Sequence, residues 1–157
     1  MSTKWSDSFV EWTVYTADED VEGDLKMRWQ MQNDWSQWDY RIGEKTGEIK
    51  IKWKGDPSNW EVRGENQIIF AHTKWKDDFS EWRIAGDQHV LNLKTRYRND
   101  GNDWIVQDDN LGKFEIFTEY EGDPRDWIIV DELKAEVDLP LKMAILFLAI
   151  YHSSPRQ

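Results

Sequence analysis

GEIKIKWKGDPSNWEVRG, residues 47–64, is the stretch that decides the fold. Apolar and charged side chains alternate on both sides of a central DPSN segment. Alternation with a period of two is typical of a β-strand, and Asp followed by Pro is typical of a turn. The stretch therefore predicts a β-hairpin in which Trp53 faces Trp60 and Ile51 faces Val62 across the two strands.

The pattern of this hairpin recurs along the chain. Six segments place an aromatic residue or methionine seven residues before a tryptophan: WSDSFVEW (5–12), MQNDWSQW (31–38), WKGDPSNW (53–60), WKDDFSEW (75–82), YRNDGNDW (97–104) and YEGDPRDW (120–127). Their final tryptophans are 26, 22, 22, 22 and 23 residues apart. A repeat of this length predicts six hairpins, and therefore an up-and-down meander of about twelve strands over residues 1–133.

Side-chain alternation divides the predicted sheet into two faces. The inner face carries the aromatic row together with Leu25, Met27, Ile49, Ile51, Leu91, Leu93, Phe114 and Ile116. The outer face is mostly polar, with four apolar exceptions at Ile68, Phe70, Ile105 and Phe117. Exposed tryptophans would suggest a glycan-binding platform, but the alternation favours a core role, and only Trp35, at a turn tip, is expected to be exposed.

Aspartate recurs at one position of the predicted turns, as Asp34, Asp56, Asp78, Asp100 and Asp123. An aspartate at such a position caps its own turn by accepting hydrogen bonds from nearby backbone N–H groups. A ring of carboxylates could alternatively hold Ca²⁺, although no loop has the density of oxygen ligands found in a dedicated calcium loop. Turn capping is the favoured interpretation, and we expect no metal site.

The chain closes with its most apolar stretch, LPLKMAILFLAIYHSSPRQ (139–157). Asp138 as N-cap, Pro140 in the first turn and the SSP segment after it predict a helix over 138–152. Such a helix could be a membrane anchor, a partner-binding helix or the core of the fold. It is shorter than the roughly 20 residues of a membrane span and is apolar on all sides, which is typical of a fully surrounded helix. We therefore expect one domain, 1–157: a closed antiparallel barrel around its C-terminal helix.

This plan resembles the Tubby-like superfamily, which includes the Tubby C-terminal domain, the phospholipid scramblases and the LURP-one-related proteins. The resemblance covers the whole chain and is carried by the strand number and by the terminal LPLKMAILFLAIY (139–151). It implies a twelve-stranded barrel closed around a hydrophobic C-terminal helix. It also implies a role in lipid recognition, because the Tubby domain holds a phosphoinositide with Lys and Arg on its barrel wall.

Composition narrows the possible partners. The formal net charge is -11 and cysteine is absent. An acidic chain is a poor general binder of nucleic acid, because phosphate neutralisation needs a basic surface. The first residues, MSTKWSDSFVEW, lack the apolar region of a secretory signal. We expect a cytoplasmic monomer without a transmembrane span, either free or peripheral at a membrane.

Sequence motifs for catalysis are absent. His72, His89 and His152 lie in separate segments without metal-ligand spacing, and the chain has no nucleophile elbow, phosphate loop or dinucleotide fingerprint. We therefore expect a protein that is not an enzyme and that needs no cofactor.

The outer face of the central strands is rich in basic residues: Lys50, Lys52, Lys54, Arg63, Lys74, Arg83, Lys94 and Arg96. A local basic strip can bind an anionic headgroup despite a negative net charge. The competing interpretation is a solvated wall in which these cations pair with neighbouring acids. The sequence thus predicts a non-catalytic barrel that binds an anionic phospholipid headgroup on this strip. The alternative function is a scaffold that contacts a protein partner through outer apolar residues such as Phe70 and Phe117.

Overall fold

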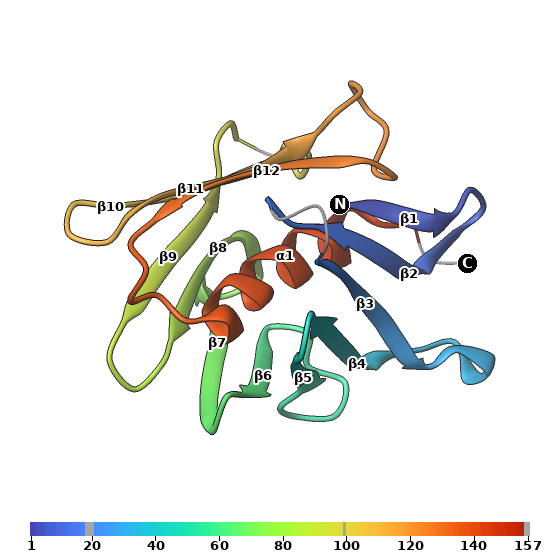
Figure 1. Cartoon of the computed structure of the whole chain (residues 1–157), viewed down its shortest axis with the longest axis horizontal. Helices are drawn as coiled ribbons and strands as arrows, with labels where there is room; N and C mark the ends of the chain where they lie inside the picture. The colour runs from blue at the N-terminus through green and yellow to red at the C-terminus, as the bar shows by residue number, and fades with distance from the viewer. Residues whose placement is uncertain (18–20, 99, 156–157) are drawn as a thin grey trace.

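A computed structural model of the chain describes residues 1–17, 21–98 and 100–155. Twelve strands form one sheet in sequential order, and a single α-helix, α1 (Leu139–Ser153), follows them (Figure 1). The strands are β1 (Ser2–Trp5), β2 (Ser8–Tyr15), β3 (Glu22–Trp29), β4 (Asp34–Ile42), β5 (Lys45–Ile51), β6 (Asn59–Gly64), β7 (Gln67–Trp75), β8 (Asp78–Ala85), β9 (Val90–Thr95), β10 (Asp103–Asp108), β11 (Gly112–Thr118) and β12 (Trp127–Leu133).

The sheet curls into a nearly closed barrel. Every neighbouring pair of strands is antiparallel, as expected for hairpins joined in series. The seam between the first and last strands is held at one end, where Ser2 forms a bridge with Asp126. Next to it, the N–H of Thr3 donates to the carbonyl of Arg125 at 2.9 Å. The prediction of a twelve-stranded barrel with one C-terminal helix is confirmed.

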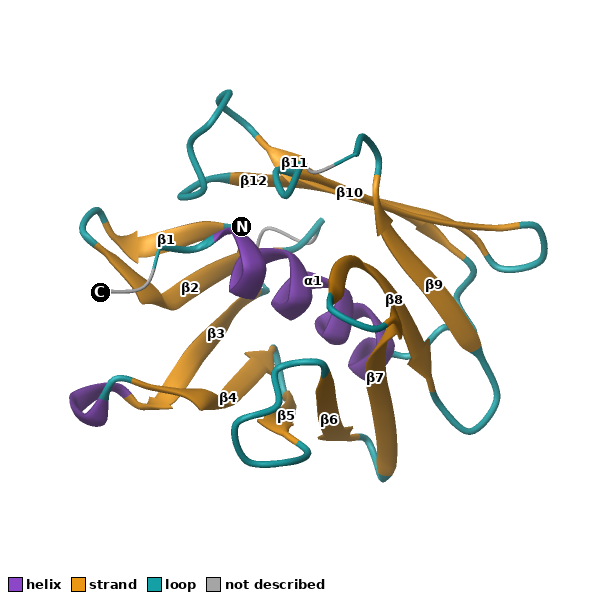
Figure 2. Cartoon of the chain, turned by 180° about the vertical axis from the view of Figure 1, so that it is seen from behind, coloured by secondary structure: helices purple, strands orange, loops and turns teal. Residues whose placement is uncertain are grey.

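Helix α1 occupies the interior of the barrel (Figures 1 and 2). Eight consecutive residues, 143–150, are at most 4 % exposed, so the helix is surrounded on all sides as its sequence predicts. Phe147 lies at its centre and packs edge-on against Trp38 and Trp60, with ring centroids 5.6 and 4.7 Å apart. No helix among the described residues is long and apolar enough to cross a membrane.

The N-cap of α1 differs in detail from the prediction. The helix runs over Leu139–Ser153 rather than 138–152, with Asp138 at the N-cap position. The Asp138 carboxylate makes no capping hydrogen bond with the helix, and it accepts one from the side-chain amide of Gln67 instead. This bond ties the start of the helix to β7.

The final tryptophan of every repeat is buried: Trp12, Trp38, Trp60, Trp82, Trp104 and Trp127 are at most 2 % exposed. Each indole N–H donates, over 2.8–2.9 Å, to the carbonyl oxygen three residues earlier in its own turn. The buried donor is therefore satisfied locally, which removes the penalty for burying the indole. This hydrogen bond links the turn to the core and explains why tryptophan occupies the same position in all six repeats.

The turn aspartates act as predicted. The carboxylate of Asp78 accepts the backbone N–H of Ser80 at 2.9 Å and its hydroxyl at 2.5 Å. Equivalent bonds to the residue two positions later occur at Asp34, Asp56, Asp100 and Asp123. In the four turns whose preceding residue the structure describes, that residue is left-handed: Asn33, Gly55, Asp77 and Gly122. Gly, Asn and Asp tolerate this conformation best, so the turns are encoded locally.

The predicted pairings of Trp53 with Trp60 and of Ile51 with Val62 are wrong, because Val62 lies opposite Ile49. Ile51 is the residue opposite Trp60, and the chain leaves the strand after it. In the β1–β2, β3–β4 and β7–β8 hairpins the register shifts by two residues next to the turn: Thr73, for example, lies opposite Trp82, but Trp75 lies opposite Asp78. The aromatic residues that precede these turns, such as Trp53 and Trp75, are exposed instead of facing the core.

Most other face assignments hold. Leu25, Met27, Ile49, Leu91, Leu93, Phe114 and Ile116 are buried, and Ile51 is partly buried against the core. On the outer face Ile68 and Phe70 are exposed, whereas Ile105 is only 7 % exposed. The expected exposure of Trp35 is wrong, because its ring is partly buried and packs against Trp38 at 5.6 Å.

Candidate functional site

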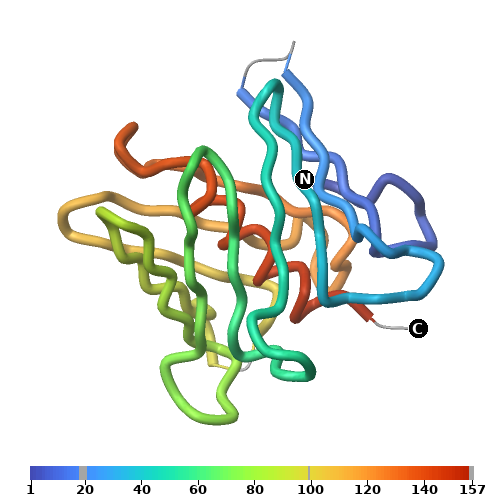
Figure 3. The backbone as a smooth tube through the Cα atoms, turned by 90° about the horizontal axis from the view of Figure 1, so that it is seen from below, coloured from blue at the N-terminus to red at the C-terminus, as the bar shows by residue number. Residues whose placement is uncertain are grey.

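Six aromatic side chains stand exposed at one end of the barrel. In a meander the odd-to-even turns, from β1–β2 to β11–β12, all lie at the same end, which we call the turn rim. Figure 3 shows two of these turns, in dark and light blue, on the side where the red C-terminal end of α1 also lies. The side chains are between 47 % and 61 % exposed, and together we call them the aromatic girdle: Trp5, Trp29, Trp53, Trp75, Tyr97 and Tyr120.

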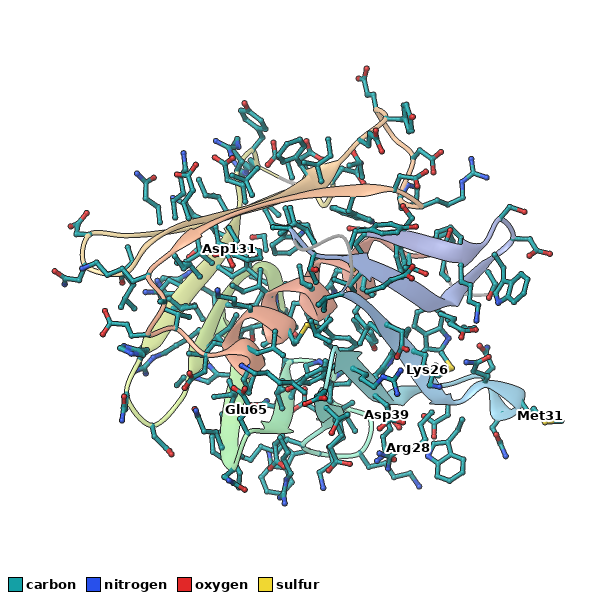
Figure 4. All side chains as sticks on the ribbon, in the orientation of Figure 1. Lys26, Arg28, Met31, Asp39, Glu65 and Asp131 are labelled. Carbon is teal, nitrogen blue, oxygen red and sulfur yellow. The ribbon has the colours of Figure 1, made fainter. Side chains whose placement is uncertain are left out.

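Trp29, rather than the predicted Met31, is the girdle member of the second repeat. Trp29 pairs with Asp34 just as Trp75 pairs with Asp78. Residues Gln30–Gln32 form a short 3₁₀ helix that lengthens this turn and accounts for two of the four additional residues in the 26-residue spacing; the other two lie between Trp12 and Trp29. Met31 projects from its tip and is 99 % exposed (Figure 4).

Several girdle indoles are held against the outer wall. Trp5 donates its indole N–H to Glu11 and Trp75 donates to Glu81, both at 3.2 Å, while Trp29 donates to Gln37 at 3.1 Å. Each acceptor directly precedes the buried tryptophan of its repeat. The rings are thus oriented while a large part of their apolar surface remains in contact with water.

Cations flank the girdle in three consecutive hairpins. Trp53, Trp75 and Tyr97 each have Lys or Arg on both sides in sequence, and we call these six cations the basic arc: Lys52, Lys54, Lys74, Lys76, Arg96 and Arg98. The hairpins β5–β6, β7–β8 and β9–β10 are neighbours in the sheet, so the arc is continuous around that part of the turn rim. Lys52 lies over the rings of Trp53 and Phe70, 5.4 and 4.7 Å from their centroids, a cation–π arrangement.

The other three girdle members have different neighbours. Trp5 follows Lys4 and precedes Ser6, and Trp29 follows Arg28 and precedes Gln30. Tyr120 lies between Glu119 and Glu121, which reverses the charge. The girdle is therefore cationic on one side of the barrel end and anionic at the β11–β12 turn.

Two of the inner cations of the arc, Lys74 and Arg96, have acidic partners, whereas the outer cations have none among the described residues. Arg96 donates to Glu115 at 2.7 Å and to Asp103 at 3.1 Å, and the bond from Arg96 holds the pKa of Glu115 below its usual value. Lys74 lies 3.9 Å from Glu81. Lys54, Lys76 and Arg98 are exposed, and none of them has an ion pair within 4.0 Å among the residues that the structure describes.

The predicted basic strip separates into two groups. Lys52, Lys54, Lys74 and Arg96 lie on the turn rim as part of the arc, whereas Lys50, Arg63, Arg83 and Lys94 lie further along the outer wall. On the wall, acids alternate with these cations across the strands. Lys50 and Lys94 lie opposite Glu61 and Glu81 in register, and Arg63 lies opposite Glu48 and 3.5 Å from Glu61. Arg83 lies between His72 and Asn92.

Two surface depressions adjoin these groups. One, of about 710 Å³, lies between the β7–β8 turn and β9, and its lining combines Lys94 and Arg98 with Asp77, Asp78 and Glu81. The other, of about 620 Å³, covers β3 to β6. Figure 4 shows Lys26, Arg28 and Asp39 on that part of the wall. Arg28 donates to Asp39 at 2.9 Å and to Glu48 at 3.1 Å, and the bonds to Asp39 are the main reason that the pKa of Arg28 is raised. Both depressions are mixed in charge.

Within residues 1–17, 21–98 and 100–155, no group of three or more His, Asp or Glu side chains is placed to hold a metal ion. The turn aspartates accept hydrogen bonds from backbone N–H groups of their own turns, and this capping role explains why aspartate recurs at that position. Comparisons with protein-family models, curated proteins and solved structures find no match to this chain. The interpretation of the site therefore depends on its geometry.

Proposed function

We propose that this protein is a non-catalytic binding domain that recognises anionic phospholipid headgroups through the basic arc. The observation that carries the proposal is the placement of a cation on both sides of an exposed aromatic residue in three consecutive hairpins. The resemblance to the Tubby-like superfamily supports the same class of ligand. The domain would act as a monomer at a cytoplasmic membrane surface.

The net charge of -11 does not prevent such binding. At an ionic strength of about 0.1 M, charges more than about 10 Å apart in water are largely screened. Eight-residue strands such as β2 span roughly 26 Å, so acids at the opposite end contribute little to the potential at the turn rim. Asp56, Asp78 and Asp100 lie in the same turns as the arc and offset part of its charge. The unpaired Lys54, Lys76 and Arg98 would be in direct contact with the headgroups.

The test is binding of the full chain to vesicles of phosphatidylcholine with and without phosphatidylserine. Each basic residue near an anionic surface contributes about 1 kcal/mol, so changing Lys54, Lys76 and Arg98 together to Gln should weaken binding roughly 100-fold. The matched control changes Lys26, Arg41 and Lys134, which are also exposed but lie outside the arc, and should have little effect. Binding should also weaken as salt rises from about 0.1 to 0.5 M. Equal losses in both triple variants, or no binding by the wild type, would reject the proposal.

A second candidate function, docking of a protein partner, is supported by an apolar pair on the outer wall. Phe117 of β11 lies opposite Ile128 of β12, which is 38 % exposed. Sedimentation velocity and pull-down of the wild type against a Phe117→Ser variant would test it. A partner that is lost on this substitution, together with unchanged vesicle binding, would identify the wall as a protein interface.

A further inference from the structure

The exposed apolar side chains of this barrel are concentrated at one end. Eleven large hydrophobic side chains are exposed among the described residues, and seven of them lie on the turn rim: the six members of the aromatic girdle and Met31. Exposed apolar residues are normally scattered singly, whereas a concentration of this kind marks an interaction surface.

The girdle has no evident task in the fold. The buried tryptophans fill the core and close the turns, while the girdle residues leave 47–61 % of their surface exposed. Three of them, Trp5, Trp29 and Trp75, lie where the register of their hairpins shifts by two residues. Their exposure at the same position of successive hairpins is itself a repeated feature.

The indole N–H groups of Trp5, Trp29 and Trp75 already have acceptors. The indole N–H of Trp75 donates to Glu81, whose carboxylate lies near Lys74. The same arrangement recurs at Trp5, Glu11 and Lys4. Such a ring can move from water into an apolar environment without leaving its indole N–H unpaired, because the acceptor moves with it.

We infer that the turn rim docks end-on against an anionic lipid bilayer, with Trp53, Trp75 and Tyr97 entering the interfacial region. Trp and Tyr favour this region because they combine an apolar ring with a polar tip. Lys54, Lys76 and Arg98, next to these rings, contact the headgroups. This inference rests on the proposed headgroup recognition and adds that the ligand is recognised as part of a bilayer, not as a free phosphate.

Charge complementarity decides which side of the girdle faces the bilayer. Tyr97 lies between Arg96 and Arg98, whereas Tyr120 occupies the same position of its repeat between Glu119 and Glu121. The two side chains are 61 % and 59 % exposed. Acids are repelled by an anionic leaflet, so the β11–β12 turn is tilted away from it.

This pair of tyrosines provides a matched test with the full chain and phosphatidylcholine–phosphatidylserine vesicles. Tyr97→Ser should weaken binding by about tenfold, because roughly 60 Å² of apolar surface that the tyrosine ring would bury in the bilayer is removed. Tyr120→Ser should bind as the wild type does. Thermal unfolding of the two variants should be alike because the side chains are equally exposed, which separates docking from stability. Lipids brominated near the headgroup should quench the tryptophan fluorescence of the bound wild type.

Three outcomes would overturn the inference. In the first, Tyr97→Ser and Tyr120→Ser bind equally well, the wild type shows no quenching, and the triple variant of Lys54, Lys76 and Arg98 loses binding. Headgroup recognition then stands and bilayer docking fails. If phosphoserine alone competes as effectively as vesicles, the ligand is a free headgroup. If a single-stranded oligonucleotide binds more tightly than vesicles and shows the same difference between the tyrosines, the partner is nucleic acid, whose bases can stack on aromatic rings between cations.

Discussion

Replacing Phe147 by alanine is expected to lower the free energy of unfolding by about 4 kcal/mol. The side chain is 1 % exposed and packs against Trp38, Trp60 and Tyr151, with ring centroids 5.6, 4.7 and 5.4 Å away. Truncation of a buried Phe to Ala typically costs about 3–5 kcal/mol. Loss of three aromatic contacts, each worth about 0.5–1.5 kcal/mol beyond burial, favours the upper part of that range.

Urea unfolding followed by circular dichroism measures this effect. With a denaturant slope of about 2 kcal/mol per molar, the midpoint should fall by about 2 M while the slope stays unchanged. Met31→Ala is the control, since Met31 is 99 % exposed and its truncation should change the midpoint little. A loss of less than about 1 kcal/mol in Phe147→Ala would refute the assignment of α1 as the centre of the core.

Two further predictions concern the helix and the turns. Deletion of residues 139–157 should abolish cooperative unfolding, because the inner faces of all six hairpins lose the helix they surround. A truncated monomer that melts like the full chain would show that the barrel does not depend on α1. The hydrogen bond from the Ser80 hydroxyl is the main reason that the pKa of Asp78 lies below its usual value. Ser80→Ala should therefore raise that pKa, as followed by carboxyl NMR, while the pKa of Asp56 in the same spectrum stays unchanged. The pKa values of these aspartates are lower in the folded than in the unfolded state. Their contribution to the free energy of unfolding is therefore present above the unfolded pKa and is lost as the pH falls through the folded pKa. A free energy of unfolding that stays constant from about pH 5 to pH 2 would contradict the capping role of these aspartates.

The architecture could be predicted because its signals are local and repeated. Period-two alternation identifies strands, the DPSN-type segments identify turns, and a helix that is apolar on all sides needs a complete enclosure. The burial of the tryptophan at the end of each repeat and the capping role of Asp78 follow from the same patterns, and the structure confirms them.

The aromatic girdle could not be predicted by counting alternation. In sequence, Trp75 lies two residues after the inward-facing Thr73 and thus has inner parity, but the register shifts by two residues between them and Trp75 is 59 % exposed. A register shift depends on cross-strand pairing, which the sequence of a single strand does not report. Flanking cations did not mark these positions either, because Lys50 and Lys52 flank Ile51, which packs against the core, in the same way as Lys52 and Lys54 flank Trp53.

The basic strip illustrates a second limit. Alternation groups the eight basic residues of the strip because their side chains all point outward. Acidic residues on adjacent strands decide which of these cations are unpaired. Arg63 and Arg96 lie near carboxylates of neighbouring residues, whereas Lys54 remains unpaired at a turn tip among the described residues. Cross-strand register, rather than parity alone, determines the local electrostatic potential.

A labelling measurement tests end-on docking most directly. Because the chain has no cysteine, one can be introduced at a chosen position and labelled with a polarity-sensitive nitrobenzoxadiazole dye. Lys76→Cys and Glu121→Cys occupy the same position of two repeats, directly after Trp75 and Tyr120. On addition of excess anionic vesicles, the label at position 76 should brighten and shift to the blue as it enters the bilayer interface, while the label at position 121 should not change. Equal responses at both positions, or no response at position 76 when binding is saturated, would contradict docking through the basic arc and the aromatic girdle.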